Sequence, residues 1–144
     1  MRRDVNTNAK HDRWLNRAVA ILEGRANGMG MPVLRALTRR GHHAAMAELA
    51  NRLTSPENSE YDLQRGLELE RRLARAVPES WIFGNLSTTL RNHGDMAGYR
   101  RWLALAARTG DLDYIAEMGR FETRFPFPIM KRWGRYRPFR RSER

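Results

Sequence analysis

The four histidines are the residues of this chain whose type best suits metal binding. His42 and His43 are adjacent, so on a helix their side chains point about 100° apart, and no carboxylate is spaced to join them as a ligand. The sequence contains no HExxH motif. It also contains no cysteine, which excludes disulfides, thiolate ligands and thiol catalysis. We expect no metal site and no cofactor.

Acid–base and nucleophilic chemistry have no better support. The carboxylate pairs Glu68–Glu70 and Asp111–Asp113 are each two residues apart, and side chains at this spacing diverge on a helix. Asp111 is better explained as a helix cap. No GxSxG elbow, P-loop or GxGxxG sequence is present. We therefore expect that the protein is not an enzyme.

Residues 131–144 carry the strongest binding pattern. Seven basic residues and one acid give this segment +6 of the net charge of +11. Aromatic residues interleave with the cations, and the residues expected to bind are Arg132, Trp133, Arg135, Tyr136, Arg137, Arg140 and Arg141. Arginines that contact phosphates and rings that stack on unpaired bases would suit RNA. The same mixture suits an acidic protein groove, where aromatic residues anchor and arginines pair with carboxylates.

A third interpretation divides the C-terminal region in two. Its apolar residues would cover the end of a helical stack, which otherwise exposes apolar surface. These residues are Phe125, Phe127, Ile129 and Trp133. The remainder would then be a solvated tail.

A second set of arginines recurs along the chain: Arg39, Arg65, Arg72, Arg101 and Arg108. Three of them fall near the ends of expected helices, and Arg65 and Arg101 stand seven residues before Arg72 and Arg108. If repeats stack, these guanidinium groups would form a cationic ladder along one face. The alternative is that the helix dipole favours a cation at a helix C-terminus by about 0.3–1 kcal/mol, with no ligand involved.

These residues must lie on helices, because no stretch of the chain alternates apolar and polar residues with the period of a strand. Seven helices are expected, the first over residues 9–23 and the fourth over residues 60–76. The inward stripe of the first helix is expected to be Trp14, Leu15, Ala18, Val19 and Leu22. The expected caps are Ser59, Ser80, Asp95 and Asp111 for the last four helices, with Gly94 and Gly110 as stops.

The chain also repeats itself. Residues 46–54 reappear 69 positions later as residues 115–123, and Gly41 keeps the same offset to Gly110. That shift equals about two units of 34–35 residues, a period typical of stacked helical hairpins. The fold class expected is all-α, a short α-solenoid of about three antiparallel hairpins. We expect a single domain over residues 1–130, followed by a basic tail over residues 131–144.

Residues 102–119 resemble the core of a Sel1-like repeat, a relative of the tetratricopeptide repeat. Residues 37–53 are a weaker copy, and residues 62–93 resemble a tetratricopeptide-type unit. The resemblance covers roughly residues 28–123, but the glycine-rich connection that follows a Sel1 unit is missing after Phe121. It implies a noncatalytic scaffold that binds other proteins on a concave face.

The charge balance points to an anionic partner, because a cationic surface attracts anions. Of the 27 basic residues 25 are arginine, a ratio that the codon bias of a GC-rich genome would also explain. No uncharged run is long enough to cross a bilayer, and we expect a cytoplasmic protein. The predicted function is a binding module, of the adaptor, inhibitor or immunity type, for an acidic protein surface. The alternative is an RNA-binding repeat protein, and an anionic membrane surface is the weakest of the three.

Overall fold

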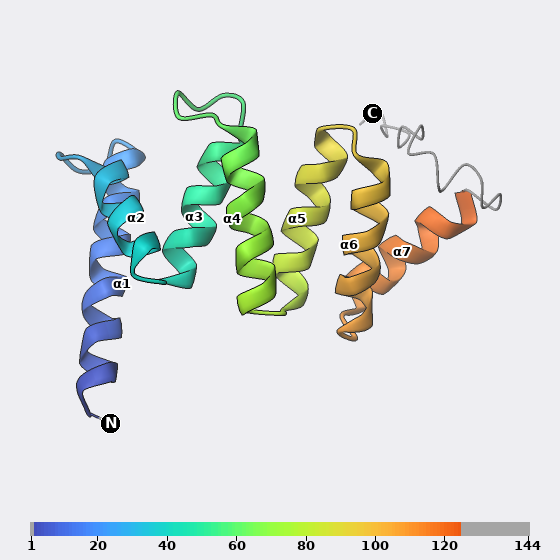
Figure 1. Ribbon diagram of the computed structural model, residues 1–144, viewed down its shortest axis with the longest axis horizontal. Coiled ribbons are helices and arrows are strands. Elements are labelled where there is room, and N and C mark those ends of the chain that lie inside the picture. Colours follow the sequence, from blue (N-terminus) through green and yellow to red (C-terminus); the bar gives the residue numbers. More distant parts are fainter. Residues whose placement is uncertain (1, 125–144) are drawn as a thin grey trace. The chain divides into compact units, whose positions relative to one another are not determined.

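The structure, a computed structural model, describes the backbone of residues 2–124 and the side chains of residues 8–122. Seven α-helices and no strand occupy this range: α1 (Arg2–Leu22), α2 (Gly30–Arg39), α3 (His43–Thr54), α4 (Leu63–Ala76), α5 (Ser80–Asn92), α6 (Met96–Arg108) and α7 (Leu112–Arg124) (Figure 1). The predicted all-α class is confirmed for this part of the chain. None of these helices combines the length and apolar character that crossing a membrane requires.

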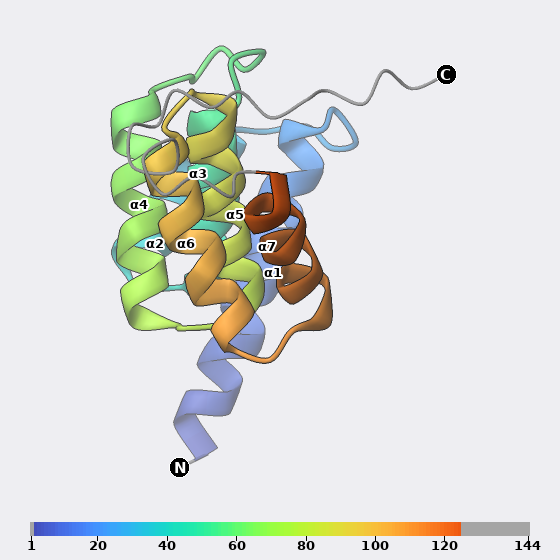
Figure 2. The same ribbon diagram turned by 90° about the vertical axis from the view of Figure 1, so that its right-hand side faces the viewer.

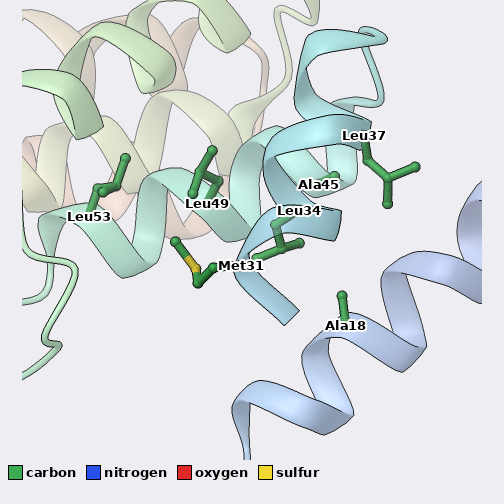
Figure 3. Close-up of a cluster of buried hydrophobic side chains, with 7 residues drawn as sticks. All are labelled: Ala18, Met31, Leu34, Leu37, Ala45, Leu49 and Leu53. Carbon is green, nitrogen blue, oxygen red and sulfur yellow. The ribbon is translucent and has the colours of Figure 1, made fainter. Parts of the chain in front are cut away.

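The chain divides into two compact units, Met1–Leu73 and Ala74–Arg144, with the division inside α4. The first unit is built on α1, α2 and α3, each packed against the next. Its core comes from all three helices and consists of Ala18, Met31, Leu34, Leu37, Ala45, Leu49 and Leu53 (Figure 3). The inward face of α3 follows a helical spacing, since Ala45, Leu49 and Leu53 are buried together with Met46.

The structure corrects one residue of the predicted stripe on α1. Ala18 is fully buried and Leu15 packs against the core, but Trp14 is 44% exposed. The helix α2 approaches α1 closely at Gly30, whose missing Cβ leaves room for Ala18 and Leu22. This contact lies at least one turn beyond Trp14, which is left at the edge of the core.

The second unit contains α5, α6 and α7, in which α5 packs on α6 and α6 on α7 (Figure 1 and Figure 2). One core cluster joins α6 and α7 through Met96, Tyr99, Leu103 and Phe121. The helix α7 also contacts α5. The Ser80 hydroxyl donates to Asp111 Oδ2 over 2.9 Å, and the Tyr114 ring lies directly against Gly84. Both contacts pair the first turns of α5 and α7, so these two helices run parallel.

Three helix-to-helix turns share one design. Each has a glycine in the left-handed region, where a Cβ would be strained. These are Gly41 (φ +80°), Gly94 (φ +84°) and Gly110 (φ +91°). Gly41 and Gly110 are the glycines related by the 69-residue repeat, so the two sequence copies have the same local structure: helix, left-handed glycine, cap and helix.

The residue after each glycine caps the next helix. Asp95 Oδ1 accepts from the Gly98 amide over 2.8 Å, and Asp111 Oδ1 accepts from the Asp113 amide over 3.1 Å. Both aspartate caps were predicted. In the first copy His42 takes this place, and its Nδ1 accepts from the Ala45 amide over 3.2 Å. A ring nitrogen that accepts carries no proton, so the Nε2 of this tautomer donates to Asp12 of α1.

Two predicted caps are wrong. The helix α4 begins at Leu63 and is capped by Asp62, whose Oδ1 accepts from the Arg65 amide over 3.1 Å. Ser59 lies too early because the Asp62 amide donates to the Leu53 carbonyl, which ties the end of the linker to α3. Ser80 is the first residue of α5 and donates to Asp111 instead of capping.

Candidate binding surface

The five arginines predicted at repeated positions all have exposed side chains: Arg39, Arg65, Arg72, Arg101 and Arg108. None of their guanidinium groups forms an ion pair or a hydrogen bond within the part of the chain that the structure describes. They are therefore not held by their own helix carbonyls. Each is accessible to a partner.

The helix dipole accounts for only part of this set. Arg39 and Arg108 are the last residues of α2 and α6, where a cation is favoured. Arg72 lies four residues before Ala76, the end of α4, and Arg65 and Arg101 lie still further from a C-terminus. The dipole effect falls off within the last turn, so it does not explain these three positions.

The structure brings the arginines together in pairs. Arg65 and Arg72 lie two turns apart on one exposed face of α4, a rise of about 10.5 Å. Arg101 and Arg108 have the same spacing and exposure on α6 in the second unit. A continuous ladder that joins these pairs stays a prediction.

Many acidic side chains, in contrast, are engaged inside the chain. Some ion pairs join residues far apart in sequence, such as Arg35 with Glu60 at 2.9 Å and Arg100 with Glu122 at 3.1 Å. Further acids pair locally or with a histidine or cap a helix, as seen for Asp12, Glu23, Glu48, Asp62, Asp95 and Asp111. The charge left at the surface therefore comes mainly from arginines.

A buried tyrosine binds one more acid. The Tyr99 hydroxyl donates to Glu117 Oε1 over 2.7 Å, and Arg91 Nη1 lies 3.4 Å from the same oxygen. Tyr99 also packs edge-on against Phe121, with ring centroids 5.6 Å apart. Burial raises the pKa of the Tyr99 phenol well above its ordinary value, and the Glu117 carboxylate raises it further, while Arg91 opposes this shift.

The raised pKa of Tyr99 predicts a loss of stability at alkaline pH. Above about pH 10 the phenol ionises in the unfolded chain but stays neutral in the fold, so stability falls by up to about 1.4 kcal/mol per pH unit. Urea unfolding of the wild type and of Tyr99→Phe from about pH 8 to pH 11 measures this effect. Wild type should be the more stable at pH 8, and the difference should shrink above pH 10. A difference that stays constant with pH would contradict the prediction.

The predicted binding residues of the C-terminal segment lie outside the described residues: Arg132, Trp133, Arg135, Tyr136, Arg137, Arg140 and Arg141. The apolar residues Phe125, Phe127 and Ile129 lie outside them as well. Within the described residues, no three histidine or acidic side chains gather closely enough to hold a metal ion. His93 instead contacts the Thr89 carbonyl oxygen through Nδ1, at 2.8 Å.

A basic face on α1 was not predicted from the sequence, because Trp14 was expected to be a core residue. Trp14 stands four residues after Lys10, one residue after Arg13 and three residues before Arg17. That spacing places all four residues on one face and could have been found from the sequence.

Comparison of the chain with protein families, with curated proteins and with solved structures gives no match. Function is therefore inferred from the fold and the surface of the chain itself.

Proposed function

We propose that the protein is a noncatalytic binding module of the helical-repeat type, a short α-solenoid of the Sel1-like or tetratricopeptide-like kind. Two features support this proposal. The hairpins α2–α3 and α6–α7 share sequence, turn and cap, and adjacent helices pack against each other within each unit. Repeats of this kind expose extended surfaces that bind other macromolecules.

The partner we propose is an acidic protein surface. The observation that carries this proposal is the contrast between the five exposed, unpaired arginines and the acids engaged within the chain. A guanidinium group offers a planar fork that grips a carboxylate at two points. An acidic surface would supply the carboxylates that these arginines lack.

The surroundings of the five arginines favour a protein over RNA. Recognition of single-stranded RNA relies on aromatic rings that stack on bases. The helices α2 and α4 contain no aromatic residue. In α6, Tyr99 is buried and Trp102 packs against Phe83 with ring centroids 5.8 Å apart. No ring on these three helices is therefore placed as a stacking platform beside the arginines.

Binding to poly-L-glutamate at physiological salt, followed by fluorescence anisotropy, tests the proposal. The double variant Arg65→Gln/Arg72→Gln should lose at least about tenfold in affinity, since two charge-assisted contacts are removed. The matched control is Arg71→Gln/Arg75→Gln, which removes the same charge from the same helix but keeps Arg65 and Arg72. We expect the control to lose less than about threefold. Arg101→Gln/Arg108→Gln should behave like the first pair.

Equal losses in both α4 double variants would mean general cationic attraction and would contradict a defined surface. Replacement of all five arginines by glutamine should weaken poly-L-glutamate binding more than binding of an oligouridine. The reverse order would assign this surface to RNA instead.

A further inference from the structure

The outward face of α1 combines cations with a half-exposed tryptophan. Lys10, Arg13, Trp14 and Arg17 stand at positions i, i+3, i+4 and i+7, which share one face of a helix. All four side chains are exposed. The Lys10 ammonium lies over the Trp14 ring, 5.3 Å from its centroid. We call these four residues the α1 basic face.

The described acids near this face do not neutralise it. Asp12 lies on another side of α1 and contacts His42 Nε2 at 3.0 Å. Glu23, at the end of the helix, pairs with Arg25. Within residues 8–122 none of the three cations of the α1 basic face forms an ion pair. Among the described side chains, no acid pairs with the three positive charges of this face.

Folding does not explain why an indole stands among these charges. The core contacts of α1 come from other residues, with Ala18 fully buried and Leu15 and Leu22 packed on the core cluster. A tryptophan that is 44% exposed leaves much of a large apolar ring in water. A flat ring surrounded by cations is the arrangement with which proteins bind single-stranded nucleic acid, because bases stack on the ring while cations follow the phosphates.

We propose that the α1 basic face binds single-stranded nucleic acid, with phosphates at Lys10, Arg13 and Arg17 and one base stacked on Trp14. Arg17 follows Lys10 by seven residues, a rise of about 10.5 Å along the helix. Lys10 covers one face of the indole, so the base would either displace the ammonium or stack on the other face. This proposal goes beyond the function proposed above, because the α1 basic face contains none of the five arginines.

Charge and packing make the other anionic partners a poorer fit. A helix that lies on a membrane must insert an apolar face, and the apolar face of α1 is packed against α2. An acidic peptide would pair with the cations, but it has no flat group for the exposed indole unless it contains aromatic residues. A nucleobase fits both parts of the face.

Binding of the full chain to a fluorescein-labelled oligouridine of about twelve nucleotides tests the proposal. Trp14→Ala should weaken binding at least about tenfold, and Trp14→Phe, which keeps an aromatic ring, should recover most of the loss. Trp81 is the matched control, because it is 43% exposed, close to the value for Trp14. Its indole N–H donates a hydrogen bond to the acid Glu79, whereas Trp14 has a cation over its ring. Trp81→Ala should bind as the wild type does.

The salt dependence tests the phosphate contacts separately. Between about 50 and 200 mM salt, the slope of log affinity against log salt should become shallower by about 2 in Lys10→Gln/Arg13→Gln/Arg17→Gln, since each lost contact contributes about 0.7. The charge-matched control is Arg40→Gln/Arg71→Gln/Arg75→Gln, whose slope should change by less than about 1. Circular dichroism should show unchanged helix content in every variant.

Three outcomes would overturn the proposal. Trp14→Ala and Trp81→Ala could bind oligouridine equally well, or the two triple variants could change the slope equally. A Trp14→Ala variant that loses as much affinity for poly-L-glutamate as for oligouridine would assign the face to an acidic peptide. If Trp14→Ala fails to fold, the triple variants decide the question. None of these outcomes bears on the α4 double variants, so the two proposals fail independently.

Discussion

Replacement of Leu34 by alanine should lower the free energy of unfolding by about 2–5 kcal/mol. Leu34 is fully buried in the middle of α2, and its cluster includes Ala18 of α1 and Leu49 of α3 (Figure 3). The substitution removes three buried carbon atoms and leaves a cavity at the junction of three helices. Urea unfolding followed by circular dichroism measures the loss.

Met29 provides the control for this experiment. It immediately precedes α2, and it is 76% exposed. Met29→Ala should change stability by no more than about 0.5 kcal/mol, as surface substitutions do. A loss below about 1 kcal/mol for Leu34→Ala would show that Leu34 does not lie in a tightly packed core.

The second large effect is expected at Gly84, where α7 meets α5. A Cβ built at this glycine would overlap the Tyr114 ring, so Gly84→Ala must displace that ring. Overpacking typically costs about 1–3 kcal/mol, while alanine gains about 1 kcal/mol over glycine in a helix. We expect a net loss of up to about 2 kcal/mol in urea unfolding.

Two further variants isolate the contact between Gly84 and Tyr114. At Gly119 of α7 a Cβ would meet no atom within 4 Å, so Gly119→Ala should gain from helix propensity alone. In the background Tyr114→Ala, the substitution Gly84→Ala should cost less than it does in the wild type, because the ring that it meets is gone. If Gly84→Ala costs the same stability in both backgrounds, the clash with the Tyr114 ring does not explain the loss.

Short-range sequence patterns, which involve residues only a few positions apart, predicted most of the helices. Glycine followed by aspartate marks both the end of one helix and the cap of the next, and Asp95 and Asp111 were found in this way. The buried face of α6 follows from the spacing of Met96, Tyr99 and Leu103. These features depend on local geometry, which a sequence displays directly.

Features that depend on a distant partner were missed. Ser80 looks like a cap in the sequence, but its hydroxyl donates to Asp111, which lies 31 residues later. The sequence likewise gives no sign that Gly84 receives the Tyr114 ring. Such contacts require knowledge of how helices approach each other, which local patterns do not contain.

The candidate binding residues divide in the same way. The repeat spacing selected the five arginines as candidate binding residues. Their exposure follows from the polar faces on which they lie. Trp14 was misplaced because a periodic pattern assigns every large apolar residue at a helix edge to the core. The folded chain leaves Trp14 44% exposed, at the edge of the core.

The use of arginine at all five repeated positions has a consequence for regulation. A guanidinium group is not deprotonated in proteins, so neither cellular acidification nor alkalinisation would switch this surface off. Lysine acetylation, which removes a charge in one enzymatic step, has no target among these residues. Control would have to come from the partner, through changes in its own negative charge such as phosphorylation or its reversal, or from competing polyanions.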